Sequence, residues 1–240
     1  MSLVFALAIA APLASPADTA ARPIHYESFK QDHVYYHAVV ADMSERQVTA
    51  KAVFSDRLTS AWTLIGQSQP AAAITGTFFG YKSQLPVADV VIDGEQVASG
   101  AIGSAVGVDW YGNVKIFDTP FQQPIDLYGY RDLLRGTVRL IKDGHVSPNP
   151  KAQHFTDPAI WGRAPRTGIG LTADKRLVMM ATKHKVTLSQ FGRAMKRLGV
   201  KQAVALDGGN SAMLYYRGDL VIPPERKLSN MFALYEEPLP

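Results

Sequence analysis

Short apolar runs that alternate with polar residues predict β-strands along most of the chain after its N-terminal segment. Residues 33–42 and 46–54 are rich in Val, Tyr and Thr and partly follow a two-residue alternation, which is typical of half-buried strands. A helical pattern covers residues 58–67, and Thr59 or Ser60 is its candidate N-cap. Strands interrupted by a helix are therefore expected in the first half of the chain.

The C-terminal part of the pattern predicts two strands, a helix and a third strand. Strands over residues 168–172 and 176–182 reverse around a short polar turn, and the Thr187 and Gln190 side chains form a capping box at the start of the helix. Gly199 stands where this helix should end. Its apolar face comprises Leu188, Phe191, Met195 and Leu198. This order predicts a single α/β or α+β domain, with a mixed β-sheet flanked by helices and a polar pocket at the strand ends.

Composition and charge narrow the class of protein. The chain has 240 residues, of which 47% are hydrophobic and 19% charged, so it is able to bury a sizeable core. Its formal net charge of +4 is scattered, which favours a phosphorylated substrate as partner and not a nucleic acid. Because the chain contains no cysteine, disulfides, thiolate metal sites and cysteine nucleophiles are excluded.

The N-terminal segment has the pattern of a secretory signal. Residues 3–15 form an apolar stretch that is short for a bilayer span, and a small-residue, proline-containing segment follows it. We therefore expect residues 1–22 to be a signal peptide or N-terminal extension and residues 23–240 to form the domain. The mature chain is then secreted or periplasmic and has no stable membrane span. A buried first helix is the alternative, because no Lys or Arg precedes the apolar stretch.

A polar stretch at the end of a buried strand is the first candidate for chemistry. A short apolar run leads directly into Asp207, Gly208, Gly209, Asn210 and Ser211. Glycines let a ligand approach the backbone, and a carboxylate there can accept a proton or bind a hydroxyl. A plain turn between two strands is the alternative, because Asp-Gly and Gly-Asn are strong hairpin signals.

A second polar stretch is expected to form another wall of the same pocket. The buried strand after the first helix runs into Thr75, Gly76 and Thr77, and the aromatic residues Phe78 and Phe79 follow. Small polar residues around a glycine leave room for a ligand. The two aromatic residues also fit the core, which is the alternative for either of them.

Two arginines are candidates for phosphate binding. Arg163 and Arg166 lie on either side of Pro165, which keeps the segment extended. A guanidinium group binds phosphate oxygens through two parallel hydrogen bonds and keeps its charge. A pair of solvated surface arginines is the alternative.

The histidines do not indicate a metal site. None of the six shows the paired helical spacing of zinc proteases, so we expect no cofactor, although Asp207 leaves room for a divalent cation. His184 is either a solvated loop residue or an acid at the edge of the pocket.

Several segments, taken in order, resemble the phosphodiester glycosidase family. They are AITGTFFGY, LPVADVVIDG, LIKDGHV, GRAPRTGIGLTADKRLVMMAT, VTLSQFGRAMKRLGVKQAVALDGGNSAMLYYRG and ERKLSNMFALYE, and the resemblance runs from about residue 71 to 236. It implies a hydrolase that removes a sugar, typically an N-acetylhexosamine, from a phosphodiester by cleavage at the anomeric carbon. The substrate is then a sugar-phosphate or a phosphodiester-linked glycan.

The resemblance also assigns individual residues to the site. The family usually has Asn where this chain has Thr75, and Gly or Ser where it has Asn210, so a catalytically idle glycan- or sugar-phosphate-binding module is an alternative. A phosphodiesterase that breaks the P–O bond is another. The residues that match family positions are Phe78, Phe79, Arg166, Thr167, Asp207, Gly208, Gly209 and Ser211.

The chemistry of glycoside hydrolysis suggests roles for the two central residues. A glycosidase normally needs two carboxylates, but a phosphate leaving group departs readily, so Arg166 can replace part of the work of the acid. Asp207 then acts as base, nucleophile or stabiliser of the oxocarbenium-like centre. The second carboxylate remains open among Asp89, Asp109, Asp174 and Glu225. We expect an exported enzyme that acts on sugar-1-phosphodiesters of cell-envelope or polysaccharide origin.

Overall fold

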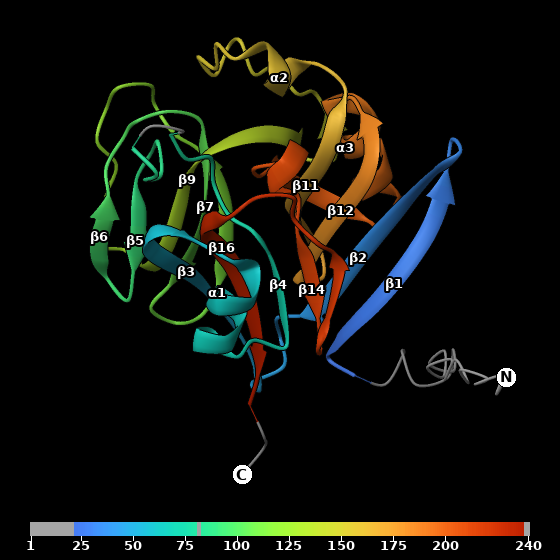
Figure 1. The fold of residues 1–240 in the computed structure, drawn as a ribbon, viewed down its shortest axis with the longest axis horizontal. Helices are drawn as coiled ribbons and strands as arrows, with labels where there is room; N and C mark the ends of the chain where they lie inside the picture. Colours follow the sequence, from blue (N-terminus) through green and yellow to red (C-terminus); the bar gives the residue numbers. More distant parts are fainter. Residues whose placement is uncertain (1–21, 81–82, 238–240) are drawn as a thin grey trace, which may run out of the picture.

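The computed structural model describes residues 22–80 and 83–237, which form two β-sheets with a few short helices (Figure 1). Of the expected signal segment, residues 1–21 lie outside the described residues. The first half contains β1 (Ile24–Gln31), β2 (Val34–Asp42), β3 (Val48–Thr59), α1 (Ala61–Ser68), β4 (Ala72–Thr75), β5 (Val90–Ile92), β6 (Glu95–Ala98), β7 (Ser104–Asp109) and β8 (Val114–Asp118). The second half contains β9 (Tyr130–Lys142), β10 (His145–Val146), α2 (Pro158–Trp161), β11 (Ala164–Thr172), β12 (Arg176–Val186), α3 (Leu188–Arg197), β13 (Val200–Ala205), a 3-10 turn (Gly209–Ser211), β14 (Leu214–Tyr216), β15 (Asp219–Ile222) and β16 (Leu228–Glu236).

The two sheets have different sizes and draw their strands from the whole chain. The larger sheet has eleven strands in the order β1-β2-β12-β11-β13-β9-β5-β6, with β7 and β10 also paired to β9 and β8 paired to β7. The smaller sheet has five strands in the order β15-β14-β4-β16-β3.

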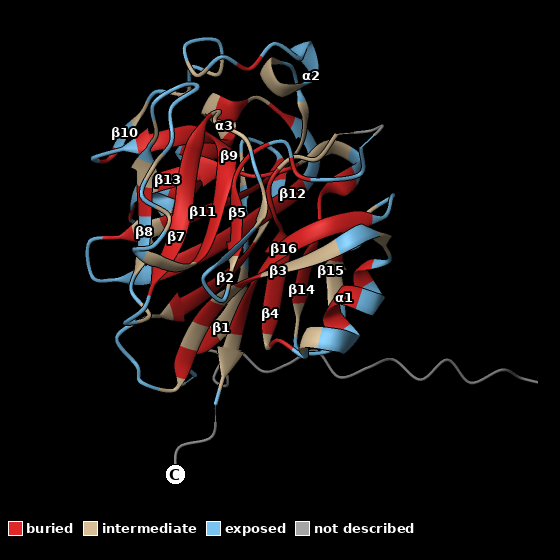
Figure 2. Ribbon diagram, turned by 90° about the vertical axis from the view of Figure 1, so that its left-hand side faces the viewer, coloured by how far each residue is buried: buried red, intermediate tan, exposed pale blue. Residues whose placement is uncertain are grey.

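Side-chain alternation along the strands divides the interior into layers. In β2, Val39 faces the core between the sheets and Val40 faces the core beneath α3. In β16, Phe232 faces the core between the sheets and Met231 packs beneath α1. The layers therefore run α1, small sheet, large sheet, α3, and the strands between them are largely buried (Figure 2).

Both helices that cover the sheets begin where the sequence predicts. Ser60 is the N-cap of α1, and the Thr187–Gln190 capping box opens α3, so these two predictions are confirmed. Gly199 follows α3 with a φ of 81°, a left-handed conformation that favours glycine. Within the described part of the chain, no helix is long and apolar enough to cross a membrane.

The prediction of a single α+β domain is confirmed, but the prediction of a mixed β-sheet was wrong. Both neighbours of β11, namely β12 and β13, pair with it antiparallel, as do the other strand pairs recorded for the described residues. Helix α3 does connect two strands of the same direction, as the order strand–helix–strand suggests. However, β11 lies between β12 and β13 and runs opposite to both, so the connection produces no parallel pair.

Candidate active site

Asp207 lies where the two sheets meet, two residues after the end of β13. Its backbone N–H donates to the Gly76 carbonyl at 3.0 Å, and its carbonyl accepts from the Thr167 hydroxyl at 2.7 Å. Gly76 follows β4 in the small sheet, whereas Thr167 belongs to β11 in the large one. The backbone of Asp207 is thus held from both sheets.

The stretch from Asp207 to Ser211 is not a hairpin turn. It carries the chain from β13 in the large sheet to β14 in the small sheet through the 3-10 turn. Gly208 passes so close to β11 that a Cβ would lie 2.5 Å from the Pro165 carbonyl oxygen, and Gly209 has a φ of 56°. The two glycines therefore meet two separate requirements, close backbone approach and left-handed backbone.

The Asp207 carboxylate is buried and has a basic partner. Nη2 of Arg226 lies 3.0 Å from its Oδ2, and Nε of the same guanidinium donates to the Ser211 hydroxyl. The guanidinium also lies over the Phe79 ring, 4.5 Å from its centroid. Burial raises the pKa of Asp207 above its ordinary value, while the Ser211 and Arg226 contacts oppose that rise. A carboxyl group held in this balance is suited to proton transfer.

Arg166 is a buried cation without a carboxylate partner among the described residues. Its Nε donates to the Val186 carbonyl at 3.3 Å, and its Nη2 donates to the carbonyls of Ile160, at 3.1 Å, and Gly162. Burial lowers its pKa to about 10, so the group stays charged at neutral pH. Carbonyl dipoles orient this charge without neutralising it, which leaves it available for an anion.

A cavity of about 640 Å³ brings these groups together. Arg166, Arg226 and the Asp207 carboxylate line it. The predicted residues that also line it are Phe78, Phe79, Gly208, Gly209 and Asn210. Further lining residues come from the segment around α2, among them His154, Phe155, Asp157 and Ile160. The volume suits a sugar with an attached phosphate group.

Thr75 and Thr77 lie behind the cavity wall and do not line it. Both side chains are buried. The Thr75 hydroxyl donates to the Ser211 carbonyl, and the Thr77 hydroxyl donates to the Arg135 carbonyl at 2.6 Å. Thr75 therefore links β4 to the 3-10 turn, and its side chain does not line the cavity.

Arg163 and His184 are exposed and do not line the cavity. Arg163 donates to the Gln190 side chain at 3.0 Å. The His184 ring lies on β12, with its centroid 6.3 Å from that of Tyr35. Of the two arginines around Pro165, the structure thus brings only Arg166 to Asp207.

The cavity has a second carboxylate, and the sequence did not indicate it. Asp89, Asp109 and Asp174 form ion pairs with basic neighbours, Glu225 is exposed, and none of the four lines the cavity. Asp157 does line it, and one of its oxygens accepts the Ala159 N–H at 2.8 Å as the N-cap of α2. Asp157 precedes Pro158, and an Asp-Pro pair is common at the start of a helix. The sequence therefore does not distinguish a carboxylate that lines a cavity from one that only caps a helix.

Two further residues of the site were missed. Arg226 stands in a short charged run that reads as solvated surface, and its contact with Asp207 spans 19 residues of chain. Asn230 is buried at the start of β16, where its Oδ1 accepts the Thr77 N–H at 2.7 Å. Gly76 has no room for a Cβ because of this side chain, whose Oδ1 would lie 1.9 Å away. Asn230 therefore sets the turn that carries Phe78 into the cavity wall.

Among the described residues, no group of three or more His, Asp or Glu side chains is arranged to hold a metal ion. Asp207 and Asp157 are the carboxylates that a divalent cation could meet in the cavity. Arg226 already occupies one Asp207 oxygen.

The chain matches a known protein family over most of its length. The family model for phosphodiester glycosidases matches residues 68–235. This range contains all the residues that line the cavity. A search of curated proteins returned no match.

Solved structures with the same fold include the zebrafish N-acetylglucosamine-1-phosphodiester α-N-acetylglucosaminidase catalytic domain, described as auto-inhibited by pro-peptide. It has a TM-score of 0.74 and 17% identity over 91% of this chain and 85% of that one. A hypothetical protein from Synechocystis has a TM-score of 0.67 and 13% identity, over 89% and 62% of the two chains. A putative exported protein from Burkholderia pseudomallei K96243 has a TM-score of 0.59 and 12% identity, over 84% and 74%. These structures share the fold, and the family match over most of the sequence shows that the chain belongs to the phosphodiester glycosidase family.

Proposed function

We propose that this chain is an active, exported phosphodiester glycosidase that releases an N-acetylhexosamine from a sugar-1-phosphodiester of cell-envelope or polysaccharide origin. The observation that carries the proposal is that one cavity brings together a buried guanidinium, which has no carboxylate partner within residues 22–80 and 83–237, and a buried carboxyl group with a raised pKa. Anion binding and proton transfer are the two tasks that this reaction requires.

Arg166 and Arg226 are proposed to bind the phosphate. Arg166 offers a charge that is oriented by carbonyl groups, and Arg226 is partly exposed, with 37% of its side-chain surface accessible, so it can turn from Asp207 toward a bound anion. Stabilisation of the departing phosphate by two guanidinium groups lowers the need for a strong general acid.

Asp207 is proposed to act at the sugar, and Asp157 is the candidate second carboxylate. Because Asp207 is buried, its carboxylate would interact strongly with a positive charge that develops at the anomeric carbon. When Arg226 turns to the phosphate, Asp207 loses its counter-charge and binds a proton or a positive centre more strongly. One oxygen of Asp157 caps α2, which leaves the other for a water molecule.

The cavity favours an active enzyme over an idle binding module. The departure at Thr75 lies behind the wall, and only the departure at Asn210 lies on the lining. An amide at that position adds hydrogen-bonding capacity and removes neither Asp207 nor Arg166.

Incubation with sugar-1-phosphodiesters tests the proposal. The purified protein, offered a set that includes uridine diphosphate N-acetylglucosamine, should release free N-acetylhexosamine. In oxygen-18 water the label should enter the sugar, because the C–O bond breaks. Label in the phosphate would identify a phosphodiesterase instead. Binding of these compounds without release of sugar from any of them would identify an idle module.

A further inference from the structure

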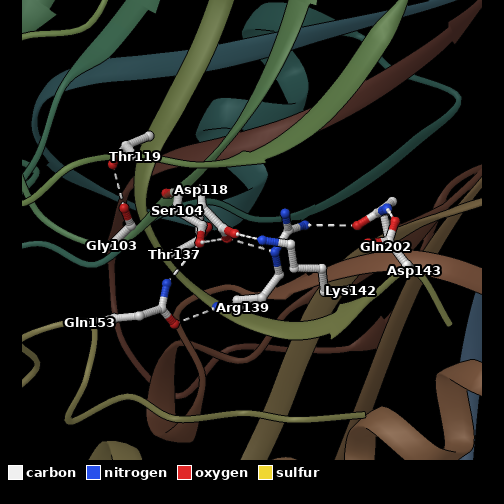
Figure 3. A network of polar contacts seen from close by, with 10 residues as sticks. All are labelled: Gly103, Ser104, Asp118, Thr119, Thr137, Arg139, Lys142, Asp143, Gln153 and Gln202. Carbon is white, nitrogen blue, oxygen red and sulfur yellow. Dashed lines mark hydrogen bonds and ion pairs between the residues drawn. The ribbon is translucent and has the colours of Figure 1, made fainter. Parts of the chain in front are cut away.

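A second polar cavity adjoins the one that contains Asp207. It has a volume of about 300 Å³, and His154 lines both cavities. Its centre is a network in which Asp118 lies between two cations, with Arg139 Nε and Lys142 Nζ each 2.8 Å from a carboxylate oxygen (Figure 3). Nothing in the proposed reaction at Asp207 uses these residues.

Buried and partly buried side chains support the network. Gln153 accepts the Arg139 backbone N–H at 2.8 Å and donates to the Ser104 hydroxyl at 2.7 Å. Arg139 is itself largely buried and donates to Gln202 at 3.2 Å (Figure 3). The Arg139–Asp118 pair is thus held in place, whereas the Lys142 side chain at the cavity remains more than half exposed.

An aromatic pair forms one side of the same cavity. The rings of Phe121 and His154 stack with centroids 3.7 Å apart and planes 13° apart. Phe121 keeps 38% of its surface accessible, although a large apolar side chain is normally buried. A flat apolar face beside charged hydrogen-bonding groups is therefore available to a ligand.

The donors and acceptors of this cavity suit hydroxyl groups better than a phosphate. A phosphate only accepts hydrogen bonds from the protein, and the Asp118 carboxylate would repel it. A hydroxyl group both donates and accepts, so it can bond Asp118 and Lys142 together. A sugar ring also has an apolar face that can pack on Phe121.

We propose that this cavity is a saccharide subsite, which binds a sugar residue esterified to the far side of the scissile phosphate. The inference rests on the proposed function, because a released terminal sugar leaves the rest of the substrate on the phosphate side. The two cavities are neighbours, because His154 lines both of them.

Two substrates of different length test the subsite. One is N-acetylglucosamine 1-phosphate esterified to methanol, and the other is the same compound esterified to O6 of methyl glucoside. The unaltered protein should cleave the longer compound with a lower KM and a similar kcat. Lys142→Met and Phe121→Ala should each lower kcat/KM for the longer compound about three- to thirtyfold and change the shorter one less than about twofold.

A matched control separates the subsite from general effects of charge. Lys115→Met removes a lysine that is also about half exposed and also pairs with an aspartate, Asp109, but neither of these residues lines the cavity. It should leave both substrates unaffected. Equal losses on both substrates in Lys142→Met, or no loss on the longer one, would overturn the subsite. A third substrate, in which a nucleotide replaces the glucoside, gives a further check. If Lys142→Met lowers kcat/KM more for that substrate than for the glucoside, the saccharide subsite is also overturned.

Failure of the proposed function gives a different result. If the unaltered protein releases sugar from neither compound, the reaction is wrong, but the subsite remains testable by calorimetry with the longer compound. Weaker binding in Lys142→Met than in Lys115→Met then supports it, and equal binding overturns it.

Discussion

Arg226 and Asp207 form an ion pair with 3.0 Å between Nη2 and Oδ2, in which the carboxylate is buried and the guanidinium is partly open to solvent. Burial alone raises the pKa of Asp207, and Arg226 lowers it again. The proton affinity of the proposed reactive group is therefore raised by burial, and this rise is opposed in part by a side chain that is partly exposed.

Replacement of Arg226 by Gln should shift the pH dependence of the reaction. Without the guanidinium, the pKa of Asp207 rises further, so the limb of the kcat/KM profile that reports Asp207 should move to higher pH. The direction is the same whether the ionised or the protonated carboxyl group is active. Measurement of kcat/KM against pH for the unaltered protein and for Arg226→Gln tests this. A limb at the same pH or at a lower pH in the variant would contradict the prediction.

Replacement of Arg166 by Lys should lower kcat/KM about ten- to a thousandfold, because the charge is kept and the paired donors are lost. Substrates with a more acidic leaving phosphate should partly restore the rate, since less departing charge then needs stabilisation. Arg163→Lys is the matched control, because Arg163 is exposed and lies outside the cavity. A similar loss in both variants would remove Arg166 from the phosphate site.

Replacement of Asp207 by Asn should lower kcat at least about a hundredfold with every leaving group. The acidic leaving groups that restore Arg166→Lys should not restore this variant, because its defect lies at the sugar. Thermal unfolding should show no large loss of Tm, since the substitution removes a buried charge and leaves Arg226 partly solvated. Equal restoration of both variants, or collapse of Tm in both, would make these residues structural.

Two glycine-to-alanine substitutions should have opposite effects on stability. Gly208→Ala places a methyl group against the Pro165 carbonyl and should lower the free energy of unfolding by about 1–3 kcal/mol. Gly66→Ala, at an exposed position of α1 with no atom within 4 Å of the new Cβ, should raise it by about 0.5–1 kcal/mol. Urea titration measures both, and a neutral Gly208→Ala would show that the backbone relaxes there.

The proposed export should be visible in the mass of the protein. Expressed in its own host, the chain should lie outside the cytoplasm and be about 14–21 residues shorter, because small residues near Ala14, Ala17 and Ala21 offer cleavage positions. Intact mass spectrometry of the fractions measures this. A full-length product in the cytoplasm would show that the apolar residues 3–15 are not a signal peptide.

The local features of this protein follow from patterns along its sequence. Two-residue alternation predicted strands, and the Thr187–Gln190 pair predicted the start of α3, because period and capping depend on near neighbours along the chain. The stretch from Asp207 to Ser211 was also recognisable, since a carboxylate and two glycines interrupt an apolar strand. The family resemblance added the expectation of a phosphodiester glycosidase.

The contacts between residues distant in the sequence depend on how the strands pair and the sheets pack. The insertion of β11 between β12 and β13 depends on long-range pairing that no local pattern encodes. The Asn230 side chain supports Thr77 across 153 residues of chain, and Arg226 reaches Asp207 from a run that reads as surface. Alternation specifies that a strand has a buried face but not which sheet it joins, so the cavity emerges only when the two sheets are packed together.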